Sequence, residues 1–133
     1  MDDFFETTVS GTVTGVLTRL ETALKQHGFG TMHVHDVKRV LESKGVEFDT
    51  ALVIMDICNP GYAKQALEAT DNRIAPLLPC SVALWQDGEQ VRVRMVRPTV
   101  LSRFFPDSPG LDKVAAEVES KVIAAVEELA EGR

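Results

Sequence analysis

The sequence predicts an α+β fold, in which a curved antiparallel sheet carries two long helices on one face. Three observations predict it. Asp87-Gly88, between two alternating apolar segments, is typical of a β-hairpin. Apolar residues recur at helical spacing over residues 10–27 and 108–130. The expected order is a strand, a helix, four strands and a final helix, with small helices inserted after the second and third strands. This order favours an antiparallel sheet with the two long helices packed on one face.

The first half of the chain carries clear start and stop signals. A strand is expected over residues 4–9, followed by a helix that Ser10 caps and Gly28 ends. A second strand is expected over residues 29–35, and Asp36 is expected to cap a short helix after it.

A nearly unbroken apolar run over residues 51–58 predicts a third strand that is covered on both faces. Asn59 and Pro60 then open the next helix, because asparagine suits the N-cap and proline the first turn. Two long helices on one side of the sheet cover only one face of this strand. The small helices, a second copy of the chain, or both must cover the other face, and on this ground the sequence predicts a homodimer.

The hairpin joins strands over residues 80–86 and 90–96. A two-residue Asp87-Gly88 turn places Cys80 opposite Met95 and, on the same apolar face, pairs Leu84 with Val91 and Val82 with Val93. The opposite face carries Ser81, Ala83, Trp85, Arg92 and Arg94. A connector follows, and Ser108-Pro109 begins the last helix.

Size and charge narrow the class of protein. The 133 residues favour a single domain over residues 1–133, and the net charge of −6 argues against nucleic-acid binding, which requires phosphate neutralisation. No apolar run approaches the ~20 residues of a membrane span. The acidic N-terminal stretch lacks the basic and apolar regions of a secretory signal, so we expect a cytoplasmic protein with reduced cysteines.

Five short motifs resemble one known family: GFG at 28–30, DV at 36–37, CNP at 58–60, AL at 66–67 and LLPC at 77–80. Together they make the chain similar to the bacterial and archaeal family called domain of unknown function 302. The resemblance implies a β-α-β(4)-α fold like that of the TATA-binding protein, usually as a homodimer, and it implies no established reaction or cofactor. Asp56 and His35 depart from the family pattern, which has a small residue and a hydrophobic residue at these positions.

Cys58 is the first candidate for chemistry. It directly precedes a predicted N-cap, and helix-end N–H groups favour a reactive thiolate. A neighbouring Asp56 carboxylate on the same strand face opposes this effect. One hypothesis is a thiol-dependent redox enzyme or sulfur carrier in which Cys58 is the nucleophile, Cys80 is the resolving cysteine and Asp56 belongs to the site. The other interpretation makes both cysteines small apolar packing residues.

Two further sites are weighed against structural roles. The first is a small anionic ligand at the helix start, bound by Cys58, Asn59, Gly61, Tyr62 and Lys64, because helix N-termini attract anions. A plain helix cap is the alternative. The second is a zinc or copper site formed by His33, His35, Cys58 and Cys80. The spacing of these four residues matches no known metal-binding motif. The preferred expectation is no metal, with His33 and His35 as surface or interface residues. Whether the protein is an enzyme stays open.

Overall fold

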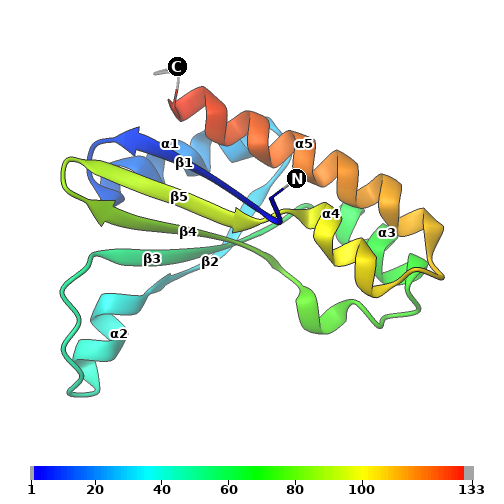
Figure 1. Cartoon of the computed structure of the whole chain (residues 1–133), viewed down its shortest axis with the longest axis horizontal. Coiled ribbons are helices and arrows are strands. Elements are labelled where there is room, and N and C mark those ends of the chain that lie inside the picture. Colours follow the sequence, from blue (N-terminus) through cyan, green and yellow to red (C-terminus); the bar gives the residue numbers. More distant parts are fainter. Residues whose placement is uncertain (1, 131–133) are drawn as a thin grey trace.

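The computed structural model describes residues 2–130, within which five strands form one antiparallel sheet (Figure 1). The strands lie in the order β1-β5-β4-β3-β2. Their bounds are Phe4–Ser10 for β1, Gly30–Asp36 for β2, Leu52–Cys58 for β3, Cys80–Asp87 for β4 and Gln90–Val96 for β5. The fold class predicted from the sequence is confirmed.

Two long helices lie together on one side of this sheet, as Figure 1 shows for α1 and α5. The short helix α2 lies on the opposite side, beyond the ends of β2 and β3. The helices are α1 (Val13–Gln26), α2 (Val37–Ser43), α3 (Pro60–Ala69), α4 (Pro98–Leu101) and α5 (Pro109–Ala130). Single 3₁₀ turns, η1 and η2, cover Ala75–Leu77 and Ser102–Phe104. From the sequence, only a connector was expected where α4 and η2 lie.

One hydrophobic core fills the space between the sheet and the long helices. Alternate residues of β3, β4 and β5 point into it, which is the two-residue period of a half-buried strand. The helices contribute residues spaced three and four apart, such as Val16, Leu20 and Leu24 of α1. Burial of this kind stabilises the fold by roughly 1.5–3 kcal/mol for each large aliphatic side chain.

The start of α1 differs from the prediction. Strand β1 continues to Ser10, which lies opposite Gln90, and Gly11 then turns the chain with a φ of +128°. Thr12 is the N-cap, and its Oγ1 accepts a hydrogen bond from the N–H of Gly15 at 3.2 Å. Ser10 cannot cap the helix because its backbone is committed to the sheet.

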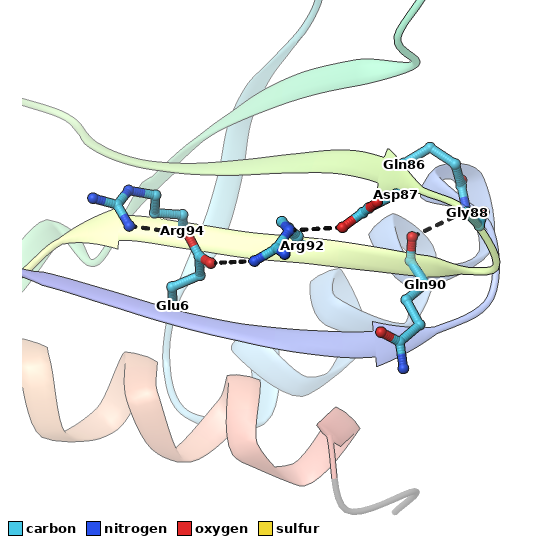
Figure 2. A network of polar contacts seen from close by, with 7 residues as sticks. All are labelled: Glu6, Gln86, Asp87, Gly88, Gln90, Arg92 and Arg94. Carbon is cyan, nitrogen blue, oxygen red and sulfur yellow. Dashed lines mark hydrogen bonds and ion pairs between the residues drawn. The ribbon is translucent and has the colours of Figure 1, made fainter.

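The hairpin register is shifted by two residues from the predicted one. Asp87 lies opposite Gln90, so the two turn residues are Gly88 and Glu89. Gly88 has a φ of +63°, which fits a glycine at the first central position of a type II′ turn. The Gln86 side-chain amide supports this turn by donating to the carbonyls of Gly88 at 3.0 Å and Gln90 at 3.2 Å (Figure 2).

A shift of two residues preserves the strand faces but changes the partners. Leu84 lies opposite Val93, and the predicted pairing of Cys80 with Met95 is wrong. Cys80 lies opposite Ile57 of β3, at the end of the sheet nearest α3. Its surroundings are therefore decided by β3 and not by β5.

The long helices cover β3 on one face only, and cover of its other face by a partner chain stays a prediction. Val53, Met55 and Ile57 are buried in the core, whereas the alternating residues are half-buried. We call the side of the sheet away from α1 and α5 the open face. It is formed by Glu6, Thr8, His33, His35, Leu52, Ile54, Asp56, Ser81, Ala83, Trp85, Arg92 and Arg94.

Candidate functional site: an apolar cavity beside two cysteines

A cavity of about 260 Å³ lies where the end of the sheet meets α3, α4 and α5. Its walls are almost entirely apolar. Phe29 and Ile57 come from the sheet side, Ile74 and Leu78 from the segment after α3, and Leu111 and Val118 from α5. Elements from distant parts of the sequence thus meet around one apolar space.

Small residues explain why this space stays open. Ala63 and Ala66 of α3 and Ala115 of α5 line the cavity, and α3 packs directly against α5. Methyl side chains at these positions allow the helices to approach without filling the volume between them. Met32, which also borders the cavity, is 63% exposed, so the cavity reaches the surface near β2.

Both cysteines line this cavity, as free thiols that are half-buried. Burial, followed by the charge of the neighbouring Cys58, raises the pKa of the Cys80 thiol. Cys80 therefore stays protonated at neutral pH, and a protonated thiol is a poor nucleophile. The structure brings Cys58 and Cys80 to one site, while Asp56, the third residue of the thiol hypothesis, does not line the cavity.

Asn59 connects the start of α3 to the turn before β2. Its Oδ1 accepts from the N–H of Tyr62 at 3.0 Å, which confirms the predicted N-cap. Its Nδ2 donates to the carbonyl of Gly28 at 2.8 Å. Pro60 has no N–H, so the donors of this helix start are largely absent or already used.

The remaining predicted ligand residues are divided by the fold. Tyr62 lines the cavity, whereas Gly61 and Lys64 are exposed and lie outside its lining. Lys64 points toward Glu68 on its own helix, with Nζ and Oε1 4.0 Å apart. The expected set of five ligand residues is therefore brought together only in part, as Cys58, Asn59 and Tyr62.

A charged residue that the sequence analysis missed lies beside Tyr62. The Nζ atom of Lys121 is 5.1 Å from the centroid of the Tyr62 ring. The Tyr62 ring also stacks with the ring of Phe29, and the two ring centroids are 6.2 Å apart. Interaction with the Tyr62 hydroxyl raises the pKa of Lys121. Lys121 lies three residues after Val118 on α5, but only the packing of α3 on α5 shows which lysine meets the cavity wall.

The histidines lie elsewhere, on the open face. His35 Nε2 is 2.7 Å from Asp56 Oδ2, and Ser81 Oγ donates to Asp56 Oδ1 at 3.1 Å. The His33 and His35 rings are in contact, with centroids 4.4 Å apart. Because Cys58 and Cys80 line the cavity, the structure does not assemble the four-residue zinc or copper set, and residues 2–130 hold no group of three or more His, Cys, Asp or Glu arranged for a metal.

An ion-pair network covers the other half of the open face (Figure 2). Glu6 accepts from Arg92 at 2.7 Å and from Arg94 at 2.9 Å, and Arg92 also donates to Asp87 at 2.9 Å. The hydrogen bond from Arg94, followed by that from Arg92, lowers the pKa of Glu6. The two arginines are thus neutralised within the chain.

Together these features define the class of protein: an α+β protein with one antiparallel sheet, long helices on one face of it, and an apolar cavity at the sheet end. Within this class, the chain belongs to the family described as Domain of unknown function DUF302, whose profile matches residues 5–129. A similar solved structure is the crystal structure of an uncharacterized conserved DUF302 protein from Bacillus stearothermophilus. It has 29% sequence identity and a TM-score of 0.89, over 97% of this chain and 99% of that chain.

The comparison with curated proteins finds no match. Across the described part of the chain, every helix is too short or too polar to cross a membrane.

Proposed function

We propose that the protein binds a small, largely apolar molecule in the cavity between the sheet end, α3 and α5. The observation that carries this proposal is the cavity itself, about 260 Å³ in volume with apolar walls. An apolar cavity of roughly 150 Å³ is enough to hold benzene. A ligand that moves from water into such a site gains about 25 cal/mol for each Å² of apolar surface that it buries.

This proposal modifies the ligand expected from the sequence. An anion bound at the start of α3 would need free N–H donors, and Asn59 already occupies that of Tyr62. Cys58, Asn59 and Tyr62 still belong to the site, but as parts of its wall.

We propose that the protein is cytoplasmic, where both thiols stay reduced.

The proposal is tested by ¹³C-methyl NMR of the four isoleucines. Ile57 and Ile74 line the cavity, whereas Ile54 lies on the open face and Ile123 is not part of the lining. Titration with 1-octanol is expected to shift the first two methyl signals and to leave the other two unchanged. Equal shifts at all four positions, or no shift at any, would contradict binding in this cavity.

A cavity-filling variant supplies a matched control. Ala63→Phe places a ring in the cavity wall, and Ala116→Phe adds the same ring at an exposed position of α5. Octanol binding should disappear in Ala63→Phe and persist in Ala116→Phe. Equal binding by both variants would mean that octanol binds elsewhere.

A second candidate function uses the thiols of Cys58 and Cys80, as a thiol-dependent enzyme or sulfur carrier. The observation that favours it is that both cysteines line one cavity. The measurement is the pH dependence of alkylation in single-cysteine variants of the folded protein. Faster modification of Cys58 than of Cys80 near neutral pH supports this function, and equally slow modification of both removes it.

We also propose that the protein is a homodimer formed through the open face. Leu52, Ile54 and Trp85 are only half-buried there, and the long helices pack on the other side. A two-fold contact places the same surface on both copies, so that surface must complement itself. The acidic and basic groups of the ion-pair network neutralise one another within one copy, so they do not oppose contact between two copies. Because Arg92 and Arg94 already pair with carboxylates of the same chain, they are not free to neutralise phosphates. This supports our expectation that nucleic acid is not a partner.

A further inference from the structure

We propose that the ligand of the cavity is an amphipathic carboxylate, whose hydrocarbon chain fills the apolar space while its carboxylate lies at Lys121 and Tyr62. This inference rests on the proposed function, because it specifies the chemical class of the molecule that the same cavity takes. Two independent features support it: the size and chemistry of the cavity, and the position of one lysine beside Tyr62, a residue of the cavity wall.

The cavity sets the length of the chain. If about 150 Å³ of apolar space holds the six carbons of benzene, about 260 Å³ holds a chain of roughly six to ten carbons. The walls supply no charged side chain, since the lining consists of aliphatic, aromatic, proline, cysteine and asparagine residues together with Tyr62 and Met32. A charged group on the ligand must therefore stay outside the apolar part of the cavity.

Tyr62 connects the apolar interior with a positive charge. Its ring lines the cavity and packs near Phe29, and the Nζ atom of Lys121 lies 5.1 Å from the same ring. Lys121 follows Val118, a lining residue, by three positions on α5, which places both on the same side of the helix. A molecule that fills the cavity and passes Tyr62 would meet this ammonium group.

Lys121 has no carboxylate within 4.0 Å in residues 2–130, unlike Lys38, which pairs with Glu42 at 3.0 Å. The charge of Glu117, one turn earlier on α5, also acts on Lys121, but more weakly than Tyr62 does. A bound carboxylate would therefore face one cation and one phenol hydroxyl, with Glu117 as the group that opposes it. This arrangement favours a monoanion over a dianion.

The experiment compares sodium octanoate with 1-octanol, which share a chain of eight carbons and differ in the head group. Binding is followed by the methyl signals of Ile57 and Ile74 in the wild type, Lys121→Gln and Lys113→Gln. Lys113 is an exposed lysine on the same helix and serves as the control. Loss of a partly exposed charge-assisted contact is expected to weaken octanoate binding by about three- to tenfold in Lys121→Gln. Octanol binding should not change.

The outcomes separate the two proposals. Octanoate binding that Lys121→Gln weakens selectively supports the inference, as does tighter octanoate binding in Glu117→Gln. Equal octanoate affinity in the wild type and Lys121→Gln overturns the inference and leaves the apolar site intact if octanol still shifts Ile57 and Ile74. Failure of both octanol and octanoate to bind overturns the proposed function itself.

Discussion

His35 and Asp56 form a hydrogen bond across β2 and β3, with Nε2 2.7 Å from Oδ2. From the sequence, these two residues were expected to differ from the family pattern, and they contact each other on the open face. Ser81 donates to the other oxygen of the same carboxylate, so the side chain of Asp56 has a partner on each side.

The pairing predicts that the two substitutions are energetically coupled. His35→Leu and Asp56→Ala should each reduce stability, and the double variant should lose less than the sum. We expect a coupling energy of about 0.5–1 kcal/mol, as for other partly exposed charged contacts. Urea unfolding of the four proteins in this double-mutant cycle measures it. Strict additivity would show that the contact contributes nothing.

Asn59 carries two functions that substitution can separate. Asn59→Asp keeps the oxygen that caps α3 and loses the amide that donates to Gly28. This variant should lose about 1 kcal/mol of stability, because one hydrogen bond disappears. Asn59→Ala should lose about 1–3 kcal/mol, because the cap disappears as well. Thermal unfolding checks the order, and an Asn59→Asp protein as stable as the wild type would contradict the role of the Gly28 contact.

The raised pKa of Cys80 predicts a loss of stability in alkali. Above the pKa of an unfolded thiol, about 8.5, the unfolded chain releases a proton that folded Cys80 retains. The free energy of unfolding should therefore fall as the pH rises from that value through the folded pKa. The fall should be smaller in Cys80→Ala than in the wild type. Urea titrations at pH 7 and pH values above 9 measure it, and equal slopes in the two proteins would contradict it.

Glu6 predicts the opposite dependence in acid. The hydrogen bond from Arg94, followed by that from Arg92, lowers the pKa of Glu6, so its contribution is present above the unfolded pKa of about 4.3. It should be lost as the pH falls through the folded pKa. Glu6→Gln should be less stable than the wild type at pH 7, by roughly 0.2–1 kcal/mol, and should lose less stability on acidification. Parallel acid profiles for the two proteins would contradict this account.

The open face predicts the behaviour of the oligomer. Ile54→Glu places a charge in the middle of the proposed contact, so it should shift a dimer toward monomer. Thr22→Glu, on an exposed position of α1, adds the same charge elsewhere and should leave the dimer intact. Sedimentation at micromolar concentration measures the mass, and circular dichroism checks that Ile54→Glu remains folded. A monomeric wild type, or a folded Ile54→Glu variant that stays dimeric, would contradict this interface.

Much of the local structure could be predicted from the sequence. Asp36 and Asn59 are the N-caps that their side chains predict, with contacts to the N–H groups of Arg39 and Tyr62. The faces of β4 and β5 follow from alternation, even where the register does not. These features depend on residues within a few positions of one another, so the sequence contains their physical cause.

By itself, then, the sequence determined the order of the strands and the two long helices, the N-caps Asp36 and Asn59, and the faces of β4 and β5, because a helix repeats every 3.6 residues and a strand every two. The tertiary structure alone decided that Gly88-Glu89 forms the turn and that Cys80 lies opposite Ile57. It also decided that Cys58 and Cys80 share a cavity and that Lys121 meets Tyr62. These relations depend on how elements far apart in the chain pack, and the volume left between α3, α5 and the sheet follows from that packing rather than from any local pattern.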